Sequence, residues 1–256
     1  MSVVETAGDP TAGTPGTART AVVTGGGSGI GRAVVRSLTA EGTRVAVVGR
    51  RRELLDEVAA ETGAVAVAAD LSRPDDVRAA TSRIVEALGV VDVLVLNAGG
   101  AHRGPLDTLE QLAEHWQQTV AQNVLTTVLL AQALRPHLRR PGGRVVVVTS
   151  ASARVVGGEV AYASSKAALN RWVKTAAAEL GRDGITVNAL SPGFVPDTGL
   201  YDESLDPAFV EAAPQRIAIG RVGTPEDIAD AVRWLGSEGA GFVNGTVVEV
   251  DGGRRV

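Results

Sequence analysis

The chain has 256 residues, of which 45% are hydrophobic and 21% charged, a balance typical of a globular protein with a sizeable core. With 25 Lys and Arg against 29 Asp and Glu, its net charge is −4, and only 3% of its residues are aromatic, which argues against a nucleic-acid partner. Cys is absent, which excludes disulfides and thiolate metal sites. We therefore expect a protein without a metal, a membrane span or a secretory signal, located in the cytoplasm.

Residues 1–18 are rich in Thr, Gly, Ala and Pro without any period and predict a flexible tail. Residues 19–256 predict one domain, in which short β-branched runs alternate with longer amphipathic stretches. The expected strands are Thr20–Thr24, Arg44–Val48, Val65–Ala69, Val91–Leu96, Arg144–Thr149, Thr186–Leu190 and Thr246–Val250. The expected helices are Gly29–Glu41, Arg52–Thr62, Asp75–Leu88, Leu109–Leu138, Val160–Gly181 and Pro225–Gly236.

This alternation predicts an α/β fold: a single doubly wound, Rossmann-type domain with a seven-stranded parallel sheet flanked by helices. Most expected strands carry a continuous apolar run and not an alternating pattern, as expected of strands covered on both faces. The longest interruption is Pro192–Arg221, which is rich in Pro, and we interpret residues near 193–220 as a substrate lid.

A glycine-rich loop follows the first expected strand directly. Residues 24–31 read Thr-Gly-Gly-Gly-Ser-Gly-Ile-Gly, and an Ala- and Leu-rich helix begins within them. Glycine lets the backbone approach a pyrophosphate closely, and the helix N-terminus offers free N–H groups and a positive dipole end. The loop predicts a dinucleotide site, and a tight turn without a ligand is the alternative.

The end of the second expected strand bears on which dinucleotide binds. An acid there would bind the ribose 2′-hydroxyl of NAD, whereas an arginine would accommodate the 2′-phosphate of NADP. Here Gly49 is followed by Arg50, Arg51 and Arg52, three cations at a helix N-terminus whose dipole disfavours them. We favour NADP(H), with NAD(H) possible and a solvated basic turn as the remaining interpretation.

Tyr162 and Lys166 are four residues apart in an expected helix and therefore share one face. A phenol with its ordinary pKa of about 10 is a poor proton donor or acceptor at neutral pH. A neighbouring ammonium favours the phenolate and lowers that pKa. The pair follows a strand and lies downstream of the glycine loop, so the context favours catalysis over a chance surface pair.

Taken in order, the motifs at residues 24–31, 97–99, 162–166 and 188–193 resemble the short-chain dehydrogenase/reductase family, and the similarity extends over residues 20–253. One departure is Leu96, where the family usually carries the first Asn of its Asn-Asn-Ala-Gly element. Among members of the family, the pattern looks most like 3-oxoacyl-acyl-carrier-protein reductases and related ketoreductases.

The resemblance implies a catalytic set made of Asn123, Ser150, Tyr162 and Lys166. In it, Ser150 orients the carbonyl, Tyr162 transfers the proton, Lys166 assists Tyr162 and holds the ribose, and Asn123 supports a water relay. The residues implied to bind the dinucleotide are Gly25, Gly27, Ser28, Gly29, Ile30, Gly31, Arg50, Arg51, Asp70, Leu71, Asn97, Ala98, Gly99, Tyr162, Lys166, Pro192, Gly193, Val195 and Thr198.

More than one residue could supply the hydroxyl of this catalytic set. Ser150 precedes Tyr162 by one residue fewer than the family spacing, which Thr149 would satisfy, and Ser152 is a further candidate. We retain Ser150, because pairing Thr149 and Ser150 with the family's two serines leaves a loop that is one residue shorter.

The expected function is therefore hydride transfer between NADP(H) and a ketone or secondary alcohol. The alternatives are an NAD-dependent alcohol dehydrogenase of the same family and a dinucleotide-binding regulator without turnover. An apolar substrate wall is expected from His102, Val155, Val156, Phe194, Leu200, Tyr201 and Phe209. The resemblance also implies a homo-oligomer, a tetramer or a dimer, to which the apolar stretch 120–134 would contribute.

Overall fold

The computed structural model describes residues 18–101, 104–156, 158–196, 198–199 and 207–254. The strands are β1 (Thr20–Thr24), β2 (Arg44–Gly49), β3 (Val65–Ala68), β4 (Val93–Leu96), β5 (Arg144–Val148), β6 (Thr186–Pro192) and β7 (Val247–Val250). The α-helices are α1 (Gly29–Ala40), α2 (Arg52–Thr62), α3 (Pro74–Leu88), α4 (Leu109–Val120), α5 (Thr126–Leu134), α6 (Val160–Leu180), α7 (Pro207–Ala212) and α8 (Pro225–Gly236).

The strands form one parallel sheet in the order β3-β2-β1-β4-β5-β6-β7. The chain runs outward from β1 to β3, returns to the centre at β4 and continues to β7, so the order reverses between β1 and β4. Ligands of such sheets bind beyond the carboxyl ends of the strands at this reversal. The predicted fold class, a single doubly wound domain with a seven-stranded parallel sheet, is confirmed.

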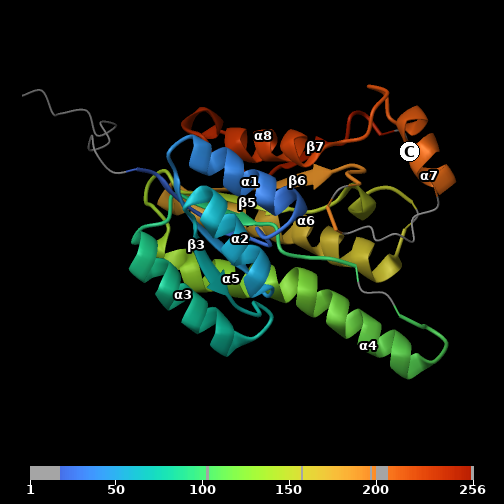
Figure 1. The fold of residues 1–256 in the computed structure, drawn as a ribbon, viewed down its shortest axis with the longest axis horizontal. Helices are drawn as coiled ribbons and strands as arrows, with labels where there is room; N and C mark the ends of the chain where they lie inside the picture. Colours follow the sequence, from blue (N-terminus) through green and yellow to red (C-terminus); the bar gives the residue numbers. More distant parts are fainter. Residues whose placement is uncertain (1–17, 102–103, 157, 197, 200–206, 255–256) are drawn as a thin grey trace, which may run out of the picture.

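Helices cover both faces of the sheet, with α3, α5 and α6 on one face and α1, α2 and α8 on the other (Figure 1). The side chains of β5 show how a strand serves two cores. Val145 and Val147 pack into the cluster beneath α3, α5 and α6, whereas Val146 packs into the one beneath α1, α2 and α8. Because both faces are buried, the strand has no position for a solvated polar residue.

The helix expected over Leu109–Leu138 is not continuous. A π-helical turn, Ala121–Leu125, separates α4 from α5, and a short 3-10 helix, Arg135–His137, follows α5. A π turn inserts one extra residue into a helix, and such insertions occur mostly where a side chain must be aimed at a site. The buried residue of this turn is Asn123.

The Pro192–Arg221 segment also differs from its prediction as an interruption without regular structure. It contains the short helix α7 and a 3-10 turn, Ala213–Arg216. Several boundaries shift by one or two residues: β6 continues to Pro192, and Val91 forms an isolated bridge with Leu138 instead of starting β4. Residues 1–17 of the predicted tail lie outside the described residues.

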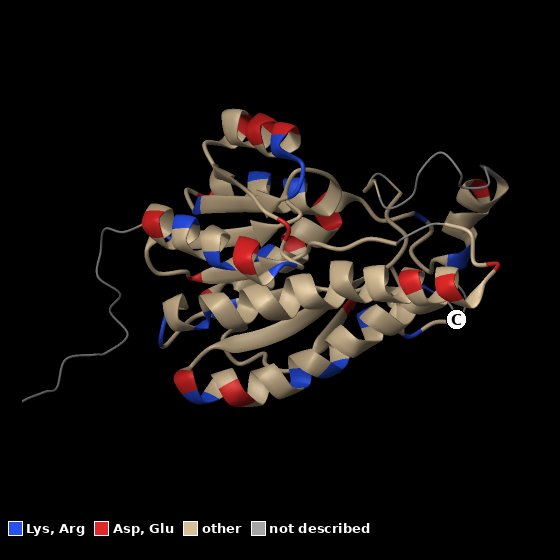
Figure 2. Ribbon diagram, turned by 90° about the horizontal axis from the view of Figure 1, so that it is seen from below, with Lys and Arg blue, Asp and Glu red and all other residues tan. Residues whose placement is uncertain are grey.

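Figure 2 shows basic and acidic residues on several of the helices. Arg32 and Arg36 of α1, for example, both pair with Glu61 of α2. None of the helices in the described part of the chain combines the length and apolar character needed to cross a membrane.

Candidate active site

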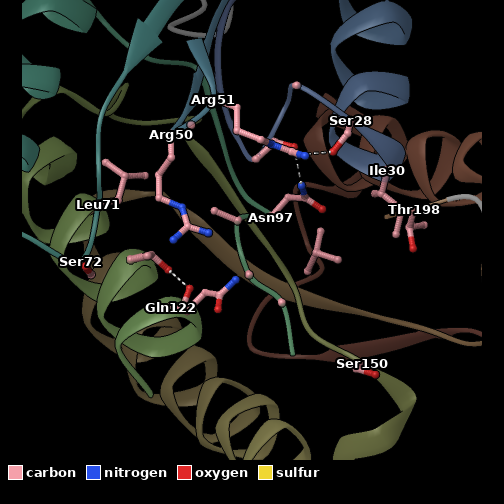
Figure 3. A pocket seen from close by; sticks show the side chains of 18 of the residues that line it. Ser28, Ile30, Arg50, Arg51, Leu71, Ser72, Asn97, Gln122, Ser150 and Thr198 are labelled. Atoms are coloured by element: carbon pink, nitrogen blue, oxygen red, sulfur yellow. Dashed lines mark hydrogen bonds between the residues drawn. The ribbon is translucent and has the colours of Figure 1, made fainter. Parts of the chain in front are cut away.

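A cavity of about 440 Å³ opens beyond the carboxyl ends of the strands, where the strand order reverses. Its lining comes from the loops after β1, β2, β3, β4, β5 and β6, together with residues of the α4–α5 region and α6. Figure 3 shows side chains from these separate segments directed into the cavity. We call this cavity the central pocket.

The glycine loop forms one wall of the central pocket at the N-terminus of α1. An added Cβ at Gly31 would overlap the carbonyl oxygen of Gly25, and one at Gly29 would lie 2.7 Å from the backbone of Thr198. Within the described residues, the Ser28 hydroxyl does not cap α1 and instead accepts a hydrogen bond from Arg51, at 2.9 Å. The first N–H groups of α1 are therefore not used by a side-chain cap and can bind an anion.

Side chains that follow β2 and β3 line another part of the central pocket. Arg50 and Arg51 both line the pocket, and in Figure 3 the Arg50 side chain extends into it. Asp70 accepts hydrogen bonds from the backbone N–H and hydroxyl of Ser72, at 3.1 and 2.7 Å. Burial acts to raise the pKa of Asp70, but these bonds and the charge of Arg50 outweigh it and the pKa is lowered. Asp70 therefore stays anionic and holds the loop in shape.

Asn97 joins the end of β4 to the glycine loop. Its side-chain amide donates to the carbonyl oxygen of Thr24 at 3.0 Å, and the Thr24 hydroxyl accepts from the backbone N–H groups of Asn97 and Ala98, both at 2.9 Å. Gly99 follows, where a Cβ would lie 2.6 Å from Asn123 Oδ1 and 3.0 Å from Lys166 Nζ. Glycine at this position lets the catalytic candidates approach the β4 loop.

Tyr162 and Lys166 both line the central pocket, from the first two turns of α6. The Lys166 Nζ lies 5.7 Å from the centroid of the Tyr162 ring and donates to the carbonyl oxygen of Val148, at 3.1 Å. Burial lowers the pKa of the Lys166 ammonium to about 8, because the charged form loses its hydration. A strongly shifted lysine beside a phenol in a cleft marks a candidate catalytic pair.

Asn123 lies in the π turn and is fully buried. Its Oδ1 accepts from the Gly100 N–H at 2.8 Å, and its Nδ2 donates to the Gly100 carbonyl at 3.0 Å and to the Ser165 hydroxyl at 2.9 Å. Ser165 in turn donates to the carbonyl oxygen of Tyr162, at 2.7 Å. Asn123 thus links the β4 loop to the turn of α6 that carries Tyr162.

The three candidate hydroxyls after β5 occupy different environments. Ser150 lines the central pocket, and its Oγ accepts from the Ser152 backbone N–H at 3.1 Å. Thr149 also lines the pocket, but its hydroxyl is buried and donates to the Leu190 carbonyl at 3.0 Å. Among the described residues that line the pocket, Ser152 does not occur. The geometry favours Ser150 over both alternatives.

The end of β6 and the residues that follow it form a further part of the central pocket, which Pro192, Gly193, Val195 and Thr198 all line. Of the predicted substrate wall, Phe194 is buried and meets Phe209 edge to face, with ring centroids 5.4 Å apart. Val155 is partly buried, whereas Val156 is 96% exposed. His102, Leu200 and Tyr201 lie outside the described residues.

Some lining residues had no signal in the sequence. Gln118, Gln122 and Thr126 reach the central pocket from α4, the π turn and α5. A continuous helix over 109–138 gives no reason to select these polar positions from the sequence. Among the described residues, no group of three or more His, Asp or Glu side chains is arranged to hold a metal.

The doubly wound sheet, and a pocket at its strand-order reversal that Ser150, Tyr162 and Lys166 line, are the features expected of a dinucleotide-binding oxidoreductase. A family model described as "Enoyl-(Acyl carrier protein) reductase" matches residues 25–255. With this match and full-length relatives above 30% identity, the chain belongs to the short-chain dehydrogenase/reductase family, as its motifs indicated.

Similar proteins include a short-chain reductase protein, NovJ, of Streptomyces niveus, 38% identical over 91% of this chain and 93% of that protein. The 3-oxoacyl-[acyl-carrier-protein] reductase MabA of Mycobacterium tuberculosis is 34% identical over 93% of this chain and 94% of that protein. A Burkholderia cenocepacia short-chain dehydrogenase solved with NADP has a TM-score of 0.83 and 37% identity, covering 92% of this chain and 97% of that chain.

Proposed function

We propose that this protein is an NADP(H)-dependent ketoreductase that transfers a hydride between the nicotinamide and a ketone or secondary alcohol. The observation that carries the proposal is the placement of Tyr162 and buried Lys166 in the central pocket, which the glycine loop and Ser150 also line. The similarity to MabA, a 3-oxoacyl-[acyl-carrier-protein] reductase, supports a 3-oxoacyl substrate or a related ketone.

The residues present fit a dinucleotide phosphate. The glycine loop leaves room for a pyrophosphate against the N-terminus of α1, whose first N–H groups the Ser28 side chain leaves uncapped. Arg50 and Arg51 follow β2 and line the pocket, where a guanidinium can bind a 2′-phosphate. Asp70, Leu71, Asn97 and Ala98 would line the remainder of the cofactor site.

When bound, NADPH supplies the hydride for the carbonyl carbon. The hydroxyls of Ser150 and Tyr162 donate hydrogen bonds to the carbonyl oxygen as negative charge develops there. Tyr162 then delivers its proton in reduction and accepts one in oxidation. Lys166 favours the phenolate form of Tyr162 and holds the nicotinamide ribose, and Asn123 supports a water relay to Lys166.

The proposal is tested by following NADPH absorbance at 340 nm with a panel of 3-oxoacyl thioesters and apolar ketones. We expect turnover with at least one of them and a strong preference for NADPH over NADH. Tight NADPH binding without turnover on any carbonyl would instead support a dinucleotide-binding regulator.

Arg50→Ala is expected to weaken NADPH binding by about tenfold or more and to leave NADH binding nearly unchanged, because only NADPH carries a 2′-phosphate for the guanidinium. Arg52→Ala is the matched control: Arg52 pairs with Asp56 at 3.6 Å and does not occur among the described pocket-lining residues. Fluorescence titration with both cofactors measures the effect. An equal loss of affinity for NADPH and NADH would show that Arg50 does not bind the 2′-phosphate, and would favour NAD(H) as the cofactor.

Ser150→Ala is expected to lower kcat by about 10²-fold, since one of two donors to the developing oxyanion is lost. Ser152→Ala should keep kcat near the wild-type value, because Ser152 contacts Ser150 through its backbone N–H, which the substitution retains. Steady-state kinetics on the best ketone compares the two variants. The opposite ranking would transfer the role to Ser152.

The proposal extends to the surroundings of the site. The segment 193–220 acts as a lid over an apolar substrate, which Gly193, Val195 and the Phe194–Phe209 pair support.

The proposal includes a homo-oligomer, either a tetramer or a dimer. It is supported by Leu109, Leu112 and Trp116 of α4, whose side chains are 79%, 39% and 37% exposed. Sedimentation velocity measures the oligomeric state. We also propose a cytoplasmic location, in keeping with the absence of Cys.

A further inference from the structure

The N-terminus of α6 carries an unusual cap. Helices are normally capped by Ser, Thr, Asp or Asn, whose short side chains reach back to the first N–H groups. Here the capping residue is Glu159, whose Oε1 accepts from the Ala161 N–H and whose Oε2 accepts from the Tyr162 N–H, both at 2.6 Å. The second of these bonds is made to the backbone of the proposed proton donor itself.

A second helix holds this carboxylate in place. His115 of α4 is buried, and its Nε2 lies 3.0 Å from Glu159 Oε1. Glutamate has one more methylene than aspartate, so as a cap it has more conformers to lose. The imidazole contact restricts those conformers. Glu159 thus accepts two backbone hydrogen bonds from α6 and lies in close polar contact with one imidazole of α4.

The charge of Glu159 is kept in this arrangement. Burial acts to raise the pKa of its carboxyl, but the hydrogen bonds from His115, Tyr162 and Ala161 outweigh it and the pKa is lowered. An anion at this position also interacts favourably with the positive end of the α6 dipole. The cap is consequently stronger than one made by a neutral hydroxyl.

Tyr162 and Lys166 depend differently on this cap. Tyr162 is the third residue of α6 and lies in the first turn, where a helix without its cap frays. Lys166 lies one turn further along, is buried, and is tied to the Val148 carbonyl at 3.1 Å. Loss of the cap would thus displace the phenol and leave the amine in place.

We propose that Glu159 and His115 form a positioning pair for the proton-transfer step: the α4 imidazole fixes the carboxylate that sets the place of Tyr162. The inference rests on the proposed function, because the reaction requires Tyr162 at the carbonyl oxygen. Neither residue touches the substrate in this scheme, and both act through the backbone of α6.

Glu159→Ala is expected to lower kcat for ketone reduction by about tenfold or more, as small displacements of a reacting group do. The dissociation constant for NADPH should remain at the wild-type value, because Lys166 and the glycine loop are untouched. Glu159→Gln retains one acceptor oxygen and should fall between the wild type and Glu159→Ala. His115→Ala should also lower kcat, but should cost nothing further in the Glu159→Ala background.

Thr224→Ala provides the matched control. Thr224 caps α8 by accepting from the Asp227 N–H at 3.2 Å, and none of the described residues of α8 lines the central pocket. Removing either cap should lower Tm by about 2–4 °C. Only the Glu159 variant should lower kcat, so a purely structural role is separated from a positioning role.

The rate of hydrogen exchange at the backbone amides of residues 160–164 reports how well the cap holds the first turn of α6. This measurement does not require turnover. The exchange should accelerate in Glu159→Ala and in His115→Ala, with residues 170–180 unchanged. Unchanged exchange, an unchanged kcat, or a parallel loss of NADPH affinity would each overturn the inference. Absence of turnover in the wild type would refute the proposed function, whereas the exchange data would still decide whether Glu159 and His115 hold the first turn.

Discussion

Tyr162→Phe should lower kcat for ketone reduction by about 10²–10⁴-fold, the range that general acid–base groups contribute. The substitution removes only the hydroxyl oxygen, which supplies the proton and one hydrogen bond to the developing alkoxide. The ring stays in a largely buried site, so packing is preserved. Lys166 keeps its bond to the Val148 carbonyl, which leaves the proposed ribose contact intact.

NADPH binding is the internal control for this variant. Fluorescence titration should show only a small loss of NADPH affinity, because the glycine loop and Lys166 still hold the dinucleotide, and thermal unfolding should give a similar Tm. Stopped-flow mixing at saturating NADPH separates hydride transfer from product release. If Tyr162→Phe retained wild-type turnover, another residue would have to donate the proton.

Gly31→Ala should have the largest effect on the cofactor site. The new Cβ would overlap the Gly25 carbonyl oxygen and would lie 2.7 Å from Asn97 Nδ2. Both neighbours are held by hydrogen bonds, since Gly25 donates to Val48 and Asn97 donates to Thr24. The glycine loop must therefore shift. We expect a loss of about 1–3 kcal/mol in the free energy of unfolding, as overpacking costs, together with a severe loss of NADPH affinity.

Gly239→Ala is the control for that loss. Gly239 is an exposed residue of the 3-10 helix Glu238–Ala240, where the nearest atom to an added Cβ is the Ser237 hydroxyl oxygen, at 3.5 Å. Its free energy of unfolding should change by no more than about 0.5 kcal/mol. Denaturant titration and NADPH titration of both variants check the prediction, which fails if Gly31→Ala binds NADPH like the wild type.

Much of the fold could be predicted because its signals are local and repeated. A strand such as β5 has four consecutive valines after Arg144, and α8 begins with a Thr cap, Pro225 and acids, so each element carries its own local signal. The interruption of the long helix at Ala121–Leu125 had no such signal. The π turn coincides with the packing around Asn123, which involves Gly100 and Ser165 from distant segments.

The candidate site likewise contains residues that could be predicted from the sequence and residues that could not. The glycine loop and the Tyr162–Lys166 pair could be predicted because glycine positions and an interval of four residues are chemical constraints within one segment. The preference for Ser150 over Thr149 could not be derived from spacing. It depends on the Leu190 carbonyl of β6, which accepts a hydrogen bond from the buried Thr149 hydroxyl.

The amino-acid sequence by itself determined the order of strands and helices, the parallel sheet and the residues of the glycine loop, because backbone preference and hydrophobic period act over a few neighbours. Only the tertiary structure decided how Lys166 loses its hydration, how Asn123 joins the β4 loop to α6, and how His115 meets Glu159. These depend on atoms that lie tens of residues apart in the chain and acquire their distances only when α4, α6 and the sheet pack together.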